Sequence, residues 1–333
     1  MKKGKIGETQ LERSVFKNIH HHRKEILAGP KVGGDYAAFS VGEDVVVTSM
    51  ASSSLAGGYN ALLALHTALN NVVCSGGNPV GVEVGILLPA KTREIAIKRI
   101  MQQIENECEK YNIEVIGGST QISTAVTEII VTVTAYAAIE GNIEFSADNI
   151  LAGQEIVMTK TIAKTGCGII ANQKKDELEK RYPSTFIEGT MEFEQDLSII
   201  NDVLVAKANN ATYLHDVNEG GIFRGLWELG EVAGRGLEVD LKSIAVQQET
   251  IEICDYVDAN PYKLMSCGNL LIVTSNGKAM TQAFLEKGIK ATVIGRFTDD
   301  NDKVIINDGE RRFLESCVED EIFGTLLEVE YER

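Results

Sequence analysis

Apolar and polar positions along the first half of the chain predict strands and helices in turn. Two short apolar runs, Tyr36–Ser40 and Val45–Ser49, flank a polar turn and predict a β-hairpin. Further strands are expected at Val80–Leu88, Ile113–Ile116 and Glu128–Ala138, the last of them rich in β-branched residues. This half therefore has the pattern of a mixed α/β arrangement rather than of segregated blocks.

Three helices are expected between these strands. The first runs from Thr9 to about His22, and the second covers Tyr59–Cys74 and ends before a glycine pair and a proline. The third follows Thr92, which is a candidate N-cap. Its apolar residues recur every three to four positions, as on one face of an amphipathic helix: Ile97, Met101, Ile104, Cys108 and Tyr111.

A break in the pattern at Asp148–Gln154 is the candidate domain boundary, so we expect one domain over residues 1–150 and another over 151–333. The second half is expected to continue with both kinds of element. Its strands are predicted at Glu155–Thr159, Leu270–Thr274, Ala291–Phe297 and Lys303–Asn307. Its helices are predicted at Glu192–Ala208, from the Gly220-Gly221 pair through Glu231, and from Lys278 to Gly288.

Composition and charge narrow the class of protein. With 333 residues the chain exceeds the usual size of a single core, and its 44% hydrophobic and 24% charged residues are typical of a soluble protein. A net charge of −16 argues against nucleic acid or an anionic membrane as a general partner, although it does not exclude a phosphate ligand. Six dispersed cysteines, with no apolar leader and no membrane-length apolar run, predict a cytoplasmic protein with reduced thiols.

Two polar segments with paired glycines are candidates for phosphate or metal chemistry. Gly33-Gly34-Asp35 could bend the backbone so that an acid reaches a metal–phosphate group, but a simple glycine turn is the more common use of such residues. His215-Asp216 precedes Gly220-Gly221 at the start of a predicted helix, where backbone N–H groups favour anions. An N-cap formed by Asp216 or Asn218 is an equally good interpretation from the residues alone.

Three other features favour ordinary structural roles. The run Lys164–Gly168 could cradle a phosphate, but it lacks the spacing of a P-loop, and a strand-to-helix turn is the favoured interpretation. The three adjacent histidines at positions 20–22 cannot converge on one metal ion, because successive helical side chains point about 100° apart. His66 is expected in a helix core, and Cys267 is expected to be a structural thiol rather than a nucleophile.

Taken in order, five segments spread over about 190 residues resemble the motifs of one superfamily. The most specific is Leu214-His-Asp-Val-Asn-Glu-Gly-Gly221, which is similar to the family's Met-His-Asp-x-x-x-Gly-Gly element. The other four segments are Gly29–Ala38, Asn70–Pro79, Ile116–Thr120 and Lys164–Ala171. On these motifs the chain is identified as a member of the PurM-like, AIR synthase-related superfamily, and it most resembles the hydrogenase maturation factor HypE-like proteins.

The resemblance implies a two-domain α+β (mixed α/β) fold. It implies an N-terminal α/β domain that pairs with its copy in a homodimer through a β-barrel-like interface, beside a C-terminal α+β domain. ATP would lie in the cleft, with Mg²⁺ held by aspartates, and would phosphorylate an acceptor oxygen of a small substrate. The acceptor and any catalytic residue are not identified by the motifs.

The resemblance also implies a set of nucleotide-binding residues, in which three of the family's carboxylates are replaced. Neutral side chains, Ser49, Asn71 and Ser119, stand where the family has aspartates, and none of them supplies the negative charge that holds Mg²⁺. Asp35 and Asp216 remain as the expected metal ligands. The full expected set is Gly34, Asp35, Ser49, Asn71, Ser119, Thr120, His215, Asp216, Asn218, Gly220 and Gly221.

Two functions are compatible with this pattern. The retained His-Asp-x-x-x-Gly-Gly element favours an ATP-using enzyme that acts on an unidentified small molecule. The lost aspartates favour a non-catalytic relative with a degenerate Mg-ATP site that acts as a ligand- or partner-binding scaffold. Nucleotide titration with and without Mg²⁺ distinguishes the two.

Overall fold

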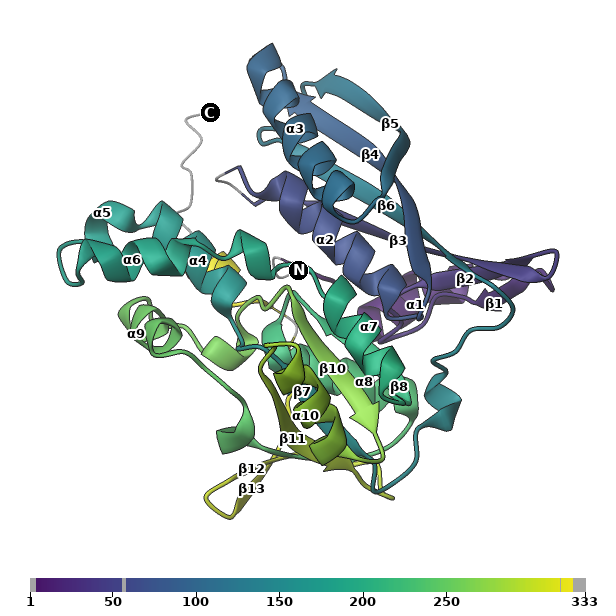
Figure 1. The fold of residues 1–333 in the computed structure, drawn as a ribbon. Helices are drawn as coiled ribbons and strands as arrows, with labels where there is room; N and C mark the ends of the chain where they lie inside the picture. The colour runs from purple at the N-terminus through teal and green to yellow at the C-terminus, as the bar shows by residue number, and fades with distance from the viewer. Residues whose placement is uncertain (1–3, 56–57, 318, 326–333) are drawn as a thin grey trace.

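A computed structural model describes residues 4–55, 58–317 and 319–325, and its strands form two sheets (Figure 1). The first sheet has the order β1-β2-β3-β6-β4-β5, in which only β4 and β5 are parallel neighbours. Its strands are β1 (Ile26–Ala28), β2 (Ala37–Val41), β3 (Asp44–Ser53), β4 (Asn78–Pro89), β5 (Glu114–Ser123) and β6 (Ile130–Ile139).

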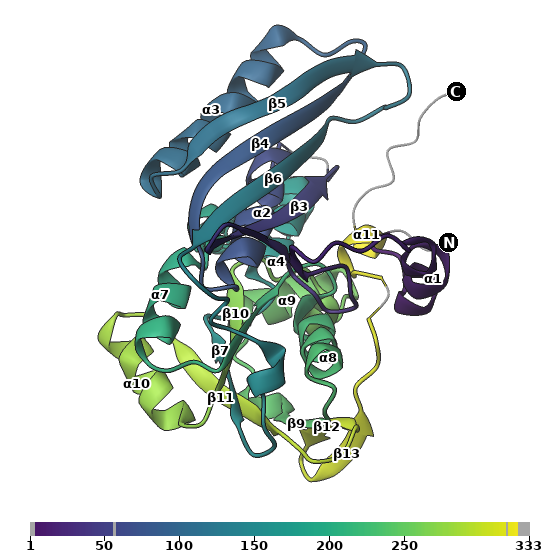
Figure 2. The ribbon, with the colours of Figure 1, turned by 90° about the vertical axis from the view of Figure 1, so that its right-hand side faces the viewer.

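Helices α2 (Asn60–Val73) and α3 (Glu94–Lys110) cover one face of this sheet. Strand alternation explains why, since Val47, Val84 and Val133 are almost fully buried on their strands. Figure 2 looks onto the opposite face, where β4, β5 and β6 lie in the foreground. Helix α2 is buried on nearly all sides because it also contacts α7 (Ile200–Ala208) and β8 (Tyr213–Val217) from the second half of the chain.

The second sheet has the order β13-β12-β9-β11-β7-β10-β8, and only β9 and β12 pair in parallel. Its remaining strands are β7 (Glu155–Thr159), β9 (Leu237–Asp240), β10 (Asn269–Thr274), β11 (Ala291–Phe297), β12 (Lys303–Asn307) and β13 (Glu310–Phe313). Helix α10 (Gly277–Glu286) packs on β7 and β11, and α8 (Gly221–Ala233) packs on β8. No strand pairing joins the two sheets among the described residues.

Shorter helices complete the second half and the two ends of the described chain. They are α1 (Glu8–Ser14), α4 (Lys164–Gln173), α5 (Lys175–Leu178), α6 (Ser184–Met191), α9 (Gln248–Tyr256) and α11 (Ile322–Thr325). Ser316, in the segment before α11, has its Oγ 3.5 Å from Glu8 Oε1 at the start of α1, and the two ends of the described chain come together in the view of Figure 2. The first and last described segments therefore meet.

Most of the expected elements are confirmed. The hairpin forms as β2 and β3, and the strands expected at Glu155–Thr159, Ala291–Phe297 and Lys303–Asn307 have those bounds in the structure. The mixed α/β fold class is likewise confirmed, because helices and strands alternate along both halves of the chain. Strand β5 extends well beyond the expected Ile113–Ile116, because the Gly117-Gly118 pair continues the strand instead of ending it.

Four local predictions are wrong. The first helix ends at Ser14, so the three histidines at positions 20–22 lie outside any helix and are exposed. Thr92 does not cap α3, whose N-cap is Arg93 without a side-chain bond. The helix expected at Glu192–Ala208 is interrupted, and only its second part forms α7. The run Lys164–Gly168 is the first part of α4 rather than a turn, because its glycines allow close packing against Leu264 and Phe193.

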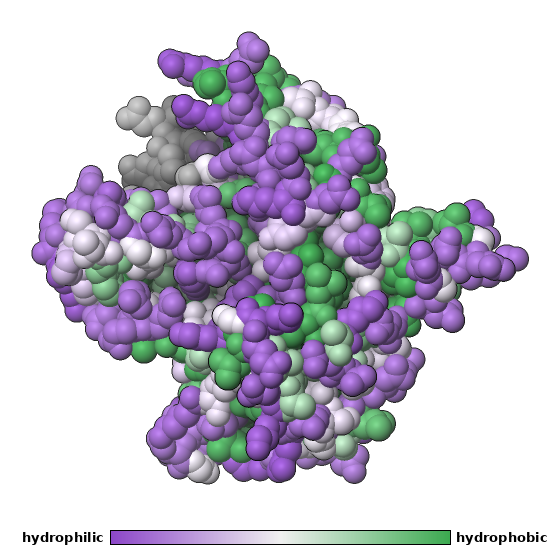
Figure 3. Space-filling view, in the orientation of Figure 1, coloured by the Kyte–Doolittle hydropathy of each residue, from purple (hydrophilic) through white to green (hydrophobic). Residues whose placement is uncertain are grey.

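Within the described residues, every helix is too short or too polar to cross a membrane. Hydrophilic residues cover most of the face shown in Figure 3, with hydrophobic patches between them. That surface agrees with the strongly acidic composition of the chain.

Candidate functional site

A cavity of about 180 Å³ lies where the N-terminal segment, α2, the end of β8 and the start of α8 meet. It brings together five of the residues that the sequence predicts for nucleotide binding: Gly34, Asp35, Asn71, Asp216 and Asn218. They come from three segments that are far apart in the chain. We call this space the acidic cavity.

A buried histidine joins two carboxylates behind the wall of the acidic cavity. His215 is fully buried, and its Nδ1 lies 2.8 Å from Asp35 Oδ2 while its Nε2 lies 3.6 Å from Glu228 Oε2. These contacts are ion pairs rather than hydrogen bonds, because Nδ1 is close to Asp35 but is not aligned for a hydrogen bond and the Nε2–Glu228 distance is too long for one. Burial by itself would lower the pKa of His215, but the carboxylates of Asp35 and Glu228 outweigh burial and raise it to about 10.

The amide of Asn71 connects Ser49 to Asp216. With its nitrogen toward Asp216, Asn71 donates to Asp216 Oδ1 at 2.8 Å, and its oxygen lies 3.0 Å from Ser49 Oγ. The hydroxyl of Ser49 also lies 2.9 Å from the backbone oxygen of Asp35 and can donate its single proton to only one of the two. Ser49 and Asn71 therefore form a neutral bridge between Asp35 and Asp216.

The remaining acids of the acidic cavity differ in their tendency to ionise. Burial, followed by the nearby Asp35 carboxylate, raises the pKa of Asp216 to about 7. Burial also opposes ionisation of Glu228, but Lys5 and then His215 hold the pKa of Glu228 well below its usual range. Lys5 also lines the acidic cavity, and its backbone N–H donates to Glu219 at 2.9 Å. The N-terminal segment thus brings a cation to a cluster of carboxylates.

A second cavity of about 440 Å³ adjoins the first and shares with it Lys31, Gly34, Asp35 and Asn71. Ser49 lines this second cavity together with Thr48, Tyr36 and Met50. The two cavities therefore share walls that include Gly34, Asp35 and Asn71 of the predicted site.

The predicted glycines are required by the backbone. Gly220 and Gly221 both have positive φ, at 89° and 64°, so they form a left-handed turn into α8. Their N–H groups are already used, since Gly220 donates to Asp320 and Gly221 donates to the carbonyl of Asn218 at 3.1 Å. The N-cap interpretation of this segment is wrong, because Gly220 is the N-cap of α8 and no side chain caps the helix.

Five of the predicted residues line neither cavity: Ser119, Thr120, His215, Gly220 and Gly221. Ser119 and Thr120 lie on β5, at the edge of the first sheet, and line neither of the two cavities. His215 also lines neither cavity, because it is buried behind Asp35.

Lys5, Arg224 and Glu228 are among the residues of the acidic cavity that the sequence interpretation missed. Arg224 Nε donates to Glu228 Oε1 at 2.8 Å, and their spacing of four residues on a helix is a signal that the sequence does contain. No local sequence pattern links Lys5 to residues more than 200 positions away, so its place in the cavity could be found only from the folded structure.

No group of three or more His, Cys, Asp or Glu side chains in the described part of the chain is arranged to hold a metal ion. Asp35 and Asp216 are nevertheless close enough for the charge of one to raise the pKa of the other. Magnesium is commonly held by one or two carboxylates together with substrate phosphates. The site therefore fits Mg²⁺ that arrives with a phosphate ligand, and it does not fit a free ion held by protein alone.

Comparisons with known proteins agree with this fold. The models of the AIR synthase related protein family match residues 30–139 (N-terminal domain) and 152–307 (C-terminal domain). A putative hydrogenase expression/formation protein of Methanocaldococcus jannaschii is 19% identical over 315 residues, which is 91% of each chain.

Two solved structures show the likeness in three dimensions. HypE in complex with ATP aligns with a TM-score of 0.65 and 15% identity over 93% of this chain and 92% of its own. AaThiL complexed with AMPPCP and TMP aligns with a TM-score of 0.70 and 18% identity over 92% of this chain and 94% of its own. The predicted PurM-like fold is confirmed by these alignments.

Proposed function

The chain belongs to the AIR synthase-related protein family, and from that premise we propose that it binds ATP and uses it to activate an acceptor oxygen of a small molecule. The observation that carries the proposal is the convergence of Gly34, Asp35, Asn71, Asp216 and Asn218 on one cavity. Structures of two proteins with this fold contain ATP or AMPPCP. The acidic cavity is smaller than most small-molecule sites, so it would take the phosphates and not the whole nucleotide.

Asp35 and Asp216 would hold Mg²⁺ together with phosphate oxygens, and the ion would neutralise phosphate charge. Lys5, Lys31 and Arg224 also line the acidic cavity and would attract the polyphosphate. His215 would hold the Asp35 carboxylate in a fixed direction through their ion pair. The backbone approaches closely here as well, because a Cβ on Gly33 would stand 2.5 Å from the carbonyl oxygen of Glu228.

We propose that the active form is a cytoplasmic homodimer. Large apolar side chains are exposed on the first sheet, among them Met50 at 69% and Ile122 at 65%. Ser119 and Thr120 would reach a nucleotide only if β5 of one copy approached the acidic cavity of the other. All six cysteines are free thiols, as is usual in a reducing compartment.

A non-catalytic scaffold is the second candidate, and one observation favours it. Asp35 is already neutralised by the cationic His215, and Asn71 places an amide where an additional carboxylate would hold Mg²⁺. Such a chain would bind a ligand or partner protein in the cleft without phosphoryl transfer.

Calorimetric titration with ATP, with and without Mg²⁺, tests the proposal. We expect saturable binding of Mg-ATP, weakened about tenfold by Asp216→Asn because a metal ligand loses its charge. Asp299→Asn is the matched control, because the Asp299 side chain is 92% exposed and far from the site in sequence. Absence of binding at millimolar nucleotide would exclude both an ATP-using enzyme and an ATP-binding scaffold. Binding without ADP formation in the presence of candidate acceptors would favour the scaffold.

A further inference from the structure

A separate cavity of about 290 Å³ lies over the second sheet, at the edge where β7 ends and β10 and β11 begin. Five short segments enclose it, and three of them directly follow β7 or lead into β10 and β11. They supply Lys160, Thr161, Lys164, Asp196, Gln247, Cys267, Gly268, Asn269, Gly288, Ile289 and Lys290. We call this space the lysine cavity, and none of its residues lines the acidic cavity.

Positive charge gathers in the lysine cavity, although the chain as a whole carries a net charge of −16. Three lysines line the space against a single carboxylate, Asp196. Lys164 forms an ion pair with Asp196, and both side chains are partly exposed. Lys290 is exposed and has no ion-pair partner among the described residues. An anion entering the cavity could therefore bind the ammonium group of Lys290 directly, and it could compete with Asp196 for the ammonium group of Lys164.

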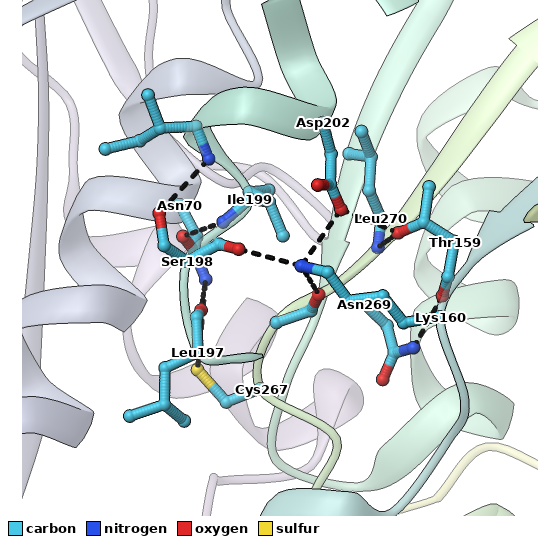
Figure 4. A network of polar contacts seen from close by, with 12 residues as sticks. Asn70, Thr159, Lys160, Leu197, Ser198, Ile199, Asp202, Cys267, Asn269 and Leu270 are labelled. Atoms are coloured by element: carbon cyan, nitrogen blue, oxygen red, sulfur yellow. Dashed lines mark hydrogen bonds and ion pairs between the residues drawn. The ribbon is translucent and has the colours of Figure 1, made fainter. Parts of the chain in front are cut away.

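The third lysine, Lys160, holds the wall of the cavity in place (Figure 4). Its ammonium group donates to the carbonyls of Ser198 at 2.8 Å and Gly268 at 2.9 Å and lies 3.0 Å from Asp202 Oδ2. All three of its donor directions are thus used within the protein. Lys160 fixes the loop before β10 against the segment before α7, and it is not free to bind a ligand.

The backbone around the lysine cavity is held in unusual conformations. Lys160 and Ala163 have φ values of 57° and 60°, a left-handed region that non-glycine residues rarely adopt. Gly268 has a φ of 98°, and a Cβ there would stand 1.8 Å from the carbonyl oxygen of Asp196. Strained residues of this kind cluster at binding sites, where the surrounding structure imposes them.

Helix α4 adds a further source of positive potential. It begins at Lys164, its N-cap Ala163 provides no side-chain bond, and the N–H groups of Lys164 and Thr165 donate to no described residue. The N-terminus of a helix with uncapped N–H groups favours an anion. Together with the lysines and the enclosed volume, it gives the cavity both charge and hydrogen-bond donors.

We propose that the lysine cavity is a binding site for a small oxyanion, a phosphate or carboxylate group, with Lys164 and Lys290 as its cationic ligands. The site is independent of nucleotide binding. It lies at the same edge of the sheet as the acidic cavity, because Asp216 of β8 pairs with Leu270 of β10 immediately after Cys267-Gly268-Asn269. The run Lys164–Gly168 thus takes part in anion binding through its lysine and its helix start, without the geometry of a P-loop.

Equilibrium dialysis with radiolabelled inorganic phosphate, at constant ionic strength set by chloride, tests the site. We expect saturable binding that Lys290→Glu weakens about tenfold or more, because the variant places a like charge beside the oxyanion. Lys287→Glu is the matched control, since Lys287 is an exposed lysine three residues away that does not line the cavity. That variant should change phosphate affinity less than about twofold, because its charge is screened by solvent. Lys164→Gln should also weaken binding.

Competition by acetate distinguishes a carboxylate site from a phosphate-selective one, and either result supports an oxyanion site. Absence of saturable phosphate binding would overturn the proposal, and so would equal weakening by Lys290→Glu and Lys287→Glu. Calorimetry of Lys290→Glu with Mg-ATP separates this site from the proposed function. Unchanged nucleotide affinity beside weakened phosphate binding supports a separate site. Equal loss of both would assign the phosphate to the nucleotide cleft and refute the lysine cavity as its site.

Discussion

Replacing Asn71 by aspartate tests whether the neutral bridge is a modified metal site. Asn71 stands 2.8 Å from the Asp216 carboxylate once its amide nitrogen faces that group. In Asn71→Asp a second carboxylate would face Asp216 at about that distance. The variant should therefore fold less stably when no cation is present, and Mg²⁺ with a nucleotide analogue should restore the lost stability.

The cost can be scaled from Asp216 itself. Burial, together with the nearby Asp35 carboxylate, raises the pKa of Asp216 from 3.8 to about 7. A shift of that size corresponds to roughly 4 kcal/mol against the charged form. A second carboxylate in the same place should lower the free energy of unfolding by about 3 kcal/mol. This cost is smaller than the value for Asp216 because the two carboxylates can share one proton.

The assay is urea unfolding at pH 8 in EDTA and in Mg²⁺ with AMPPCP. Asn71→Ala is the matched variant, because it removes the same amide without adding charge and should lose about 1–2 kcal/mol in either buffer. Equal stability of Asn71→Asp in the two buffers would refute the idea that this position can hold a metal ligand.

Three further substitutions test local parts of the account. Asp320→Ala removes the acceptor of three backbone N–H groups, including that of Gly220, and should cost about 3 kcal/mol in urea unfolding, whereas the exposed Asp299→Ala should cost under about 1 kcal/mol. Gly221→Ala should cost about 2–4 kcal/mol, because its Cβ would stand 2.7 Å from two backbone oxygens at a φ of 64°, and a thermal melt within a degree of wild type would contradict this. The contact with His66, opposed by burial, lowers the pKa of Glu107 to about 2. This contribution is present above the unfolded pKa of about 4.5 and is lost as pH falls toward 2, so the stability advantage over Glu107→Gln should disappear across that range. A stability difference between the two proteins that does not change with pH would contradict the role of the pair.

Elements with a strong local pattern were predictable from the sequence. The strands of the second sheet have continuous apolar runs, and the bounds expected for β7, β11 and β12 are those found. The prediction of one helix over Glu192–Ala208 was wrong, because long-range hydrogen bonds hold the residues just before α7 in a non-helical conformation. Asn70 accepts from Ile199 N at 3.1 Å and donates to Leu197 O at 2.8 Å, which fixes this segment against α2.

The sequence predicted which residues line the candidate site better than it predicted the contacts that those residues make. Motif order indicated Asp35 and Asp216, and both line the acidic cavity. The ion pairs of His215 with Asp35 and Glu228 depend on residues that only the fold brings together, so no local pattern indicated them. The sequence also suggested that the N–H groups of Gly220-Gly221 face a bound anion, whereas Gly220 donates to the distant Asp320 and Gly221 donates to the nearby carbonyl of Asn218.

The central claim is that a nucleotide places its phosphates in the acidic cavity. A crystal structure of the protein with AMPPCP and Mg²⁺ tests this most directly. We predict density for the phosphates between Gly34 and Asp216, with the metal in contact with the carboxylates of Asp35 and Asp216. Density for the analogue at another place, or an unchanged Asp35–His215 pair beside an empty acidic cavity at saturating analogue, would contradict the account.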